Sequence, residues 1–173
     1  MLLKEQEEYL QAIPDGAIAH VHSFDEHARE VALRLIEDLK IALPEATILH
    51  FGSTKTGIAG ENEIDIGVIA RDTFMTAKHT LSGMFGDPVL VDGKEHLVRW
   101  TPTREGFPVE LFLMAKLSPR IQEYLDTQRL LEARGDLRSQ LERLKFSFDG
   151  KSLRDYTKAK FEFFNSILHP RVM

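Results

Sequence analysis

A short bend between two apolar segments constrains this chain more than any other feature of its sequence. The first segment, residues 46–51, is mostly apolar and runs directly into Gly52-Ser53. The second, residues 63–70, begins with two carboxylates, Glu63 and Asp65, two positions apart. Short apolar segments bounded by turn residues predict buried strands. Because alternate residues of a strand point to the same face, the two carboxylates should stand side by side, about 6–7 Å apart.

The chemistry of this acidic pair favours a bound cation. Neighbouring carboxylates repel each other and do not both stay ionised without a positive charge between them. Carboxylate oxygens are suitable ligands for Mg²⁺ or Mn²⁺. The bend beside them offers backbone N–H groups and the Ser53 hydroxyl, which suit phosphate oxygens. The sequence therefore predicts a site for a metal ion and a phosphate, and the alternative is an edge strand that places Glu63 in water.

A third carboxylate, Glu110, lies near the start of another predicted strand, residues 108–115. Spacing along the chain does not place Glu110 opposite Glu63 and Asp65. If the strands are neighbours, three carboxylates converge, enough to hold two Mg²⁺ ions about 4 Å apart in the manner of phosphoryl and nucleotidyl transfer enzymes. If residues 108–115 form an edge strand, Glu110 faces water instead.

Length and composition limit the class of protein. A chain of 173 residues suits one domain with a sizeable core, so we expect a single domain over residues 1–173. Because the chain has no cysteine, disulfides, thiolate zinc sites and cysteine nucleophiles are excluded. The sequence has neither an apolar segment of membrane-spanning length nor a secretory signal at its start, so we expect no membrane partner and a cytoplasmic location.

The charge of the chain is unevenly distributed. The net charge of −5 argues against broad binding of nucleic acid. Residues 1–115 carry 10 Lys and Arg against 19 Asp and Glu, whereas residues 116–173 carry 12 against 8. An acidic half that faces a more basic half suits a bound metal–nucleotide. The alternative is that the basic half consists of solvated helices.

The pattern of apolar residues and turn signals predicts an α+β fold, with a mixed α/β core over about residues 17–115 and helices packed on it over about 118–168. Four signals predict where helices begin: a capping box at Ser23–Glu26, a cap at Asp72, the pair Ser118-Pro119, and a cap at Ser152. Gly135 suits a helix end and Asp92-Gly93 a hairpin turn. The expected helices cover 1–12, the capping box to 42, 72–85, 118–134, 136–146 and 152–168, and the expected strands 17–22, 46–51, 63–70, 89–91, 94–101 and 108–115.

These residues resemble a known group of proteins. Gly-Ser followed by carboxylates two positions apart on the next strand is similar to the signature of the nucleotidyltransferase superfamily. The segments 50–54, 64–66, 124–125 and 156–163 resemble the GrpB-like family in order and spacing, and the resemblance covers about residues 20–168. It implies a nucleotidyltransferase-like α+β fold, with a small mixed sheet, helices on one side and a C-terminal helical segment. It implies no settled activity or substrate.

The resemblance also assigns residues to a site. It places Gly52, Ser53 and Thr54 on a phosphate-binding turn and Asp65 at a metal-ligand position. Lys55 follows the turn, where it meets either a phosphate or solvent. Lys160 interrupts the apolar stripe of the last helix. Its ammonium either reaches water along the alkyl stem or points across the packed interface toward the acidic strands or a phosphate.

One departure from the superfamily concerns the second carboxylate. In active members it lies two residues after the first, and counted from Asp65 this position is Gly67, which has no side chain. Counted from Glu63, the partner is Asp65 itself. Either Glu63 compensates for Gly67 or the site has lost a ligand, and all three positions share one face of the strand.

Three functions follow as hypotheses. The first is a nucleotidyltransferase that uses Mg²⁺ or Mn²⁺ to move a nucleotidyl group from a nucleoside triphosphate to an acceptor. Glu63 and Asp65 would bind the metal, Glu110 would be a third ligand or a general base, Gly52-Ser53 would hold the triphosphate, and Lys160 would neutralise charge. The second is a catalytically degenerate protein that binds a nucleotide or another phosphorylated metabolite. The third is a protein-interaction module that keeps only the scaffold.

Overall fold

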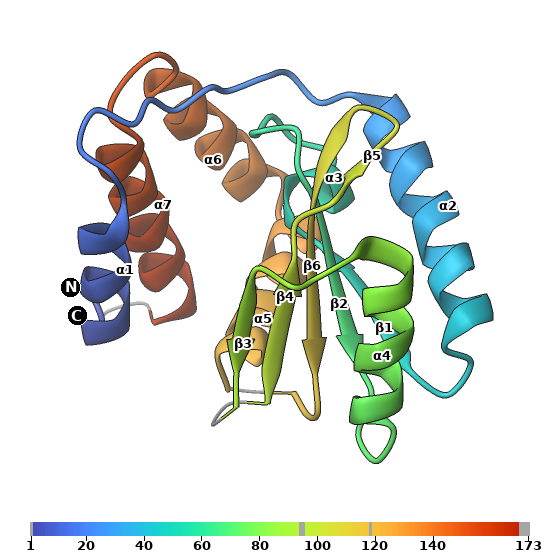
Figure 1. Cartoon of the computed structure of the whole chain (residues 1–173). Helices are drawn as coiled ribbons and strands as arrows, with labels where there is room; N and C mark the ends of the chain where they lie inside the picture. The colour runs from blue at the N-terminus through green and yellow to red at the C-terminus, as the bar shows by residue number, and fades with distance from the viewer. Residues whose placement is uncertain (1, 94–95, 118, 170–173) are drawn as a thin grey trace.

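A mixed sheet lies at the centre of the molecule in the computed structural model, which describes residues 2–93, 96–117 and 119–169 (Figure 1). Within these residues the sheet has six strands, in the order β1-β2-β6-β4-β3, with β5 paired to β6 off this path. The elements along the chain are α1 (Lys4–Ala12), α2 (Glu26–Ala42), β1 (Thr47–Phe51), α3 (Gly52–Thr56), β2 (Ile64–Ile69), α4 (Phe74–Phe85), β3 (Leu90–Asp92), β4 (Leu97–Trp100), β5 (Thr103–Arg104), β6 (Phe107–Met114), α5 (Pro119–Ala133), α6 (Gly135–Ser147) and α7 (Leu153–Leu168).

The two central strands are parallel to each other. β2 pairs with β6 in parallel register, so that Asp65 lies opposite Glu110. The β1–β2, β4–β6, β3–β4 and β5–β6 pairs are antiparallel. A parallel pair needs a long crossover connection, which here contains α4 and the β3–β4 hairpin. The predicted α+β fold with a small mixed sheet is thereby confirmed.

The two faces of the sheet have different roles. On one face, alternate residues of β2 and β6 are fully buried and pack against α2 and α4: Ile64, Ile66, Val68, Val109, Leu111 and Leu113. The intervening residues, among them Asp65 and Glu110, therefore point to the opposite face. There α5 approaches the sheet, and the rings of Phe51 and Tyr124 lie 6.0 Å apart. The carboxylates consequently face away from the main core.

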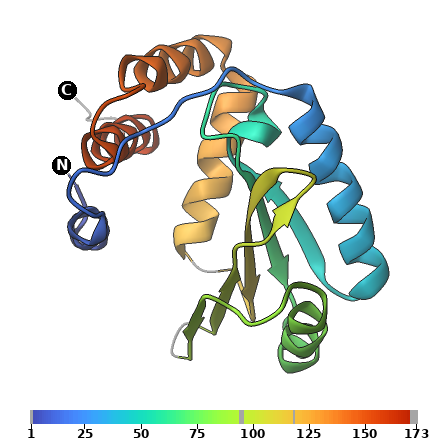
Figure 2. The ribbon, with the colours of Figure 1, turned by 45° about the horizontal axis from the view of Figure 1, so that its top comes forward.

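A helical layer stands beside this second face. Figure 2 shows α1, α6 and α7 gathered on one side of the sheet and α2 and α4 on the other, with the chain between α1 and α2 crossing over the top. The guanidinium of Arg154 in α7 donates to the carbonyls of Leu10 (3.0 Å) and Ile13 (2.6 Å), which attaches α1 to α7. Among the helices that the structure describes, none is both long enough and apolar enough to cross a membrane.

The predicted strand over residues 17–22 is wrong. Ile18 forms an isolated bridge with Ser152, and His22 forms another with Gly60. The chain is extended here because it crosses between the helical layer and the α3 segment, and no second strand runs alongside it in the described residues. The next helix begins at Glu26, where the Asp25 side chain accepts from the His27 amide at 2.9 Å, so Asp25 and not Ser23 is the N-cap.

Other boundaries also differ from the prediction. Thr73 and not Asp72 precedes α4, and Gly52–Thr56 forms a short helix where a loop was expected. Gly135 is the first residue of α6 and not the end of α5, because one extended residue, Arg134, is enough to separate the two helices. β4 begins at Leu97, and β5 was not predicted. The predicted cap at Ser118 and the start of the predicted strand at 94 lie outside the described residues.

Candidate functional site

The structure brings the three predicted carboxylates to one face of the sheet. Asp65 and Glu110 are register partners on β2 and β6, and neighbouring strands lie about 4.8 Å apart. Glu63 immediately precedes β2 and lies two positions before Asp65, so it shares this face. Because β2 and β6 both have neighbours on each side within the sheet, the edge-strand alternative for Glu63 and Glu110 is wrong.

Burial and mutual repulsion raise the pKa values of these carboxyl groups. Burial, followed by the charges of Glu61 and Glu110, raises the pKa of Glu63 to about 7. Burial, followed by the charges of Glu63 and Glu110, raises the pKa of Asp65 to about 7. Burial also raises the pKa of Glu110, while Arg99 opposes this rise. A cation placed among the three groups would favour their ionised forms.

The bend residue Gly52 is in direct contact with Asp65. Gly52 adopts a left-handed conformation with φ +81°, and a Cβ atom at this position would lie 1.9 Å from Oδ2 of Asp65. The preceding residue, Phe51, is the register partner of Asp65 on β1. Only glycine therefore allows the carboxylate to lie over the bend, and the two motifs recognised in the sequence form one structural unit.

Gly52→Ala should destabilise the protein by about 1–3 kcal/mol, because the added methyl group both clashes with Asp65 and strains the left-handed backbone. Urea unfolding monitored by circular dichroism measures this difference. The matched control is Gly83→Ala in α4, where a Cβ would meet no atom within 4 Å; this change should raise stability by about 0.5–1 kcal/mol. Equal stability of Gly52→Ala and wild type would show that Asp65 does not rest on the bend.

Gly67 is explained by packing. A Cβ atom at this position would lie 3.1 Å from Cε1 of Phe51 and 3.2 Å from Cε of Met114. These side chains cross the sheet above Gly67 and leave no space for a carboxylate. Whether Glu63 compensates for the missing side chain at Gly67 or the site has lost a ligand stays a prediction.

A buried lysine in the helical layer contacts the bend. Lys145 of α6 is only 4% exposed, and its ammonium donates to the Ser53 hydroxyl and to the Ala59 carbonyl, the latter at 2.8 Å. Burial, assisted by the charge of Lys160, lowers the pKa of Lys145 to about 7. The sequence signal for this residue is weak: it continues the apolar stripe of Leu137 and Leu141 at a spacing of four.

Lys160 points toward the acidic segment and not to solvent. Its ammonium lies 3.1 Å from Oε2 of Glu61 and 4.1 Å from the centre of the Tyr156 ring. Glu61 was not among the predicted site residues, although it shares the alternation of Glu63 and Asp65. Tyr156 is fully buried, and its hydroxyl has no hydrogen-bond partner within the part of the chain that the structure describes.

Two residues predicted to bind phosphate have other contacts. The Thr54 hydroxyl donates to the Glu63 carbonyl at 2.6 Å, which connects α3 to the start of β2. The Lys55 ammonium lies 4.0 Å from a carboxylate oxygen of Glu132 on α5. Both residues remain beside the bend. Phosphate binding by either residue stays a prediction.

The chemistry of the donor set fits a hard divalent cation, since all three candidates are carboxylates that share one face. In the arrangement described here, however, no three His, Cys, Asp or Glu side chains among residues 2–93, 96–117 and 119–169 are grouped closely enough to hold a metal ion. The guanidinium of Arg99 lies 3.6 Å from a carboxylate oxygen of Glu110 and forms an ion pair with it.

Comparison with known proteins identifies the fold. A family model described as GrpB protein matches residues 18–170. The crystal structure of the conserved protein GrpB from Enterococcus faecalis superposes with a TM-score of 0.64 and 18% sequence identity, covering 86% of this chain and 99% of that chain. No curated protein sequence matches the chain.

Other similar structures are larger proteins with the nucleotidyltransferase fold. A cytoplasmic RNA terminal U-transferase has a TM-score of 0.52 at 15% identity, covering 82% of this chain and 43% of that chain. The GLD-2/RNP-8 complex has a TM-score of 0.55 at 13% identity, covering 96% of this chain and 64% of that chain. The chain thus spans less than two thirds of these relatives. At such low identity the likeness shows the fold alone.

Proposed function

Because this chain belongs to the GrpB protein family and its fold is similar to that of nucleotidyltransferases, we propose that it is a nucleotidyltransferase that depends on Mg²⁺ or Mn²⁺. It would move a nucleotidyl group from a nucleoside triphosphate to an acceptor. The observation that carries this proposal is the pairing of Asp65 with Glu110 directly beside Gly52-Ser53. Similar folds occur in a terminal U-transferase and a poly(U) polymerase, which supports the assignment.

The metal ligands would be Glu63 and Asp65, with Glu110 as a third ligand or as a general base. When bound, the ion would offset the negative charge of the transferring phosphate and lower the pKa of the acceptor group. Burial, together with the neighbouring carboxylates, raises the pKa values of Glu63 and Asp65 to about 7, so these groups retain protons that a bound cation would displace. Binding of a cation would release protons from these carboxyl groups, so affinity should rise with pH.

The phosphate-binding groups would be the Ser53 hydroxyl together with Lys145 and Lys160. The Lys145 ammonium already contacts Ser53, so a donor and a positive charge lie at the same point. Lys160 reaches the same region from α7, where Glu61 now holds it. These lysines belong to the more basic second half of the chain and face the carboxylates of the first half. In this proposal, the basic second half of the chain would supply the lysines that bind the phosphates.

In the transfer step, the acceptor oxygen would bond to the α-phosphorus while the bond to the pyrophosphate oxygen breaks. Glu110 would take the proton of the acceptor, a role for which its raised pKa suits it. The pyrophosphate would leave with the electron pair of the broken bond, toward Lys145 and Lys160. Their positive charges would stabilise the charge that develops there.

Calorimetric titration of nucleoside triphosphates with MgCl₂ tests this proposal. Wild type should bind at least one of them, and Glu63→Gln should weaken that affinity about 30-fold, because a neutral amide replaces a charged ligand. The matched control is Glu37→Gln on α2, which removes an exposed carboxylate paired only with Lys40. Absence of binding by wild type, or equal affinity of Glu63→Gln, would refute the proposal.

A second candidate is a protein that binds a nucleotide or another phosphorylated metabolite without chemistry. The ion pair between Arg99 and Glu110 favours it, because a carboxylate that is paired with Arg99 is less available as a ligand or as a base. Measurement of pyrophosphate release in the same titrations separates the two functions. Binding without pyrophosphate release, across a screen of hydroxyl and amine acceptors, would favour this second function.

A further inference from the structure

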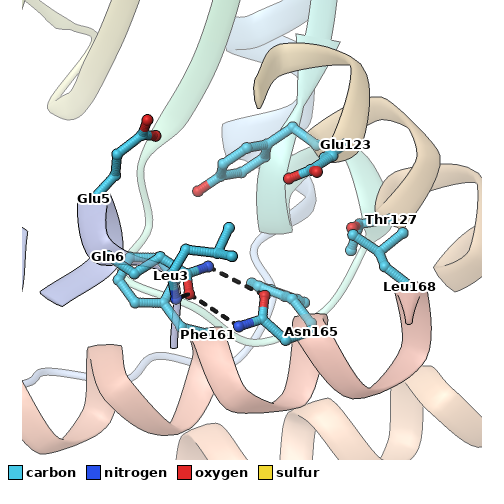
Figure 3. A pocket seen from close by; sticks show the side chains of 10 residues that line it. Leu3, Glu5, Gln6, Glu123, Thr127, Phe161, Asn165 and Leu168 are labelled. Atoms are coloured by element: carbon cyan, nitrogen blue, oxygen red, sulfur yellow. Dashed lines mark hydrogen bonds between the residues drawn. The ribbon is translucent and has the colours of Figure 1, made fainter. Parts of the chain in front are cut away.

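A cavity of about 190 Å³ lies between α1, α5 and α7, apart from the carboxylate site (Figure 3). Three aromatic side chains line it, Tyr124 from α5 and Phe161 and Phe164 from α7. Leu3 and Leu168 add aliphatic surface to these rings, so this part of the cavity suits an apolar body. The cavity is smaller than the roughly 300 Å³ at the lower end of drug-sized pockets, and it therefore fits a small molecule.

The charged groups at this cavity are both negative. Glu5 of α1 and Glu123 of α5 line it, and Figure 3 shows them on opposite sides of the space. Within the described residues neither carboxylate has a hydrogen bond or ion pair, and no lysine or arginine lines the cavity. A cation that enters the cavity would therefore find two carboxylates without a competing partner.

Another wall of the cavity is held by hydrogen bonds between side chains of the protein. The side-chain amides of Gln6 and Asn165 exchange two hydrogen bonds, of 3.1 Å and 2.9 Å, which join α1 to α7 (Figure 3). The Gln6 amide oxygen also accepts from the Leu3 amide at 2.9 Å. Because these amide groups bond to each other, a ligand needs only to match the apolar rings and the two carboxylates.

We propose that this cavity binds a small organic cation, namely an amine or ammonium group carried on an aryl or alkyl body. The faces of aromatic rings attract cations, the carboxylates supply opposite charge, and the apolar lining takes the body of the ligand. One wall is α1, which precedes the range 18–170 that the family model matches. The site therefore depends on a helix outside the region shared with the family.

The cavity adjoins the carboxylate site without being part of it. Tyr9 of α1 packs edge-on against Phe161, which lines the cavity, with 5.9 Å between the ring centres. The carboxylate site is proposed to bind an anionic metal–nucleotide, and the cavity a cation. Neither site requires the other, so failure of one assignment leaves the second intact.

Calorimetry with a matched set of probes tests the inference at pH 7.5 and 150 mM salt. The probes are 4-phenylbutylamine, its neutral analogue 4-phenylbutan-1-ol and its anionic analogue 4-phenylbutyrate. The amine should bind at least about tenfold more tightly than the alcohol, because charge attraction and cation–π contact add to the same apolar burial. The butyrate should bind more weakly still.

Variants then locate the binding. The double variant Glu5→Gln with Glu123→Gln should weaken amine binding about tenfold and leave alcohol binding unchanged. Glu162→Gln, an exposed change on α7 outside the lining, should alter neither. Three results would each overturn the inference: no binding of the amine to wild type, equal affinity for amine and alcohol, or amine binding unaffected by the double variant.

Discussion

Replacing Asp65 with asparagine should abolish Mg²⁺-dependent nucleotide turnover, with a loss of at least about 10³-fold in rate. Asp65 is the central member of the acidic group, since it follows Glu63 by two positions and lies opposite Glu110. Asparagine has nearly the same shape, so it keeps the contact with Gly52 while it removes the charge. Pyrophosphate release under saturating Mg²⁺ measures the effect, and unchanged release would refute the assignment.

The same variant should make the apo protein more stable at alkaline pH. Because the pKa of Asp65 is raised to about 7, the folded state binds this proton more tightly than the unfolded state does. The stability that the protonated Asp65 side chain contributes to the folded state is complete below about pH 4, and it is lost as the pH rises through 7. Asparagine does not titrate, so Asp65→Asn should exceed wild type by about 2 kcal/mol at pH 8 and match it near pH 4.

Urea unfolding at pH 4, 6 and 8 without divalent ions measures this difference between variant and wild type. Addition of Mg²⁺ at pH 8 should stabilise wild type and leave Asp65→Asn unchanged, because the ion binds to the ionised carboxylates. The matched control is Asp38→Asn, a partly exposed carboxylate on α2 that pairs with Arg104. A difference that does not change with pH would show that Asp65 is not held in a buried, repulsive environment.

Replacing Lys145 with methionine should weaken the affinity for a nucleoside triphosphate by about 30-fold or more while the protein still folds. The ammonium lies against Ser53, where a phosphate would bind, and it is almost completely buried. Burial makes its charge more effective toward a phosphate than that of an exposed lysine. Methionine occupies a similar volume and adapts to the same apolar surroundings.

The pH dependence of stability distinguishes this role from simple packing. Because the pKa of Lys145 is lowered to about 7, the folded state binds fewer protons than the unfolded state between pH 7 and about 10.5. Wild type therefore loses stability from this group as the pH falls through that window, and the methionine variant does not. The stability of Lys145→Met relative to wild type should accordingly rise from pH 9.5 to pH 7.

Lys158→Met on the exposed side of α7 is the matched control, and calorimetry with urea unfolding provides both measurements. This control should change neither triphosphate affinity nor the pH dependence. If Lys145→Met binds the triphosphate as tightly as wild type does, the lysine serves only to hold Ser53 and Ala59 in place. The phosphate would then have to be bound by other groups.

Local pattern was sufficient to predict several features of the fold around the candidate site. The shared face of Glu63 and Asp65 follows from the two-residue period of a strand, which holds in any tertiary context. The apolar stripe of the last helix predicted α7 with Ser152 at its N-cap, and the Ser152 side chain accepts from the Asp155 amide. Local pattern failed at residues 17–22. An extended segment becomes a strand only when it forms a continuous ladder with another strand, and here residues 17–19 bond to residues 150–153 while His22 bonds to Gly60.

The sequence by itself thus determined which residues share a face and where most of the helices and strands lie, because these depend on neighbours within a few positions. Only the tertiary structure decided that Glu110 lies beside Asp65, because this requires β6 to return parallel to β2 after a crossover. It also decided the partners of Lys145 and Lys160, Ser53 and Glu61, which lie 92 and 99 positions away. Contacts at such separation arise from the packing of the helical layer on the sheet, which no local period encodes.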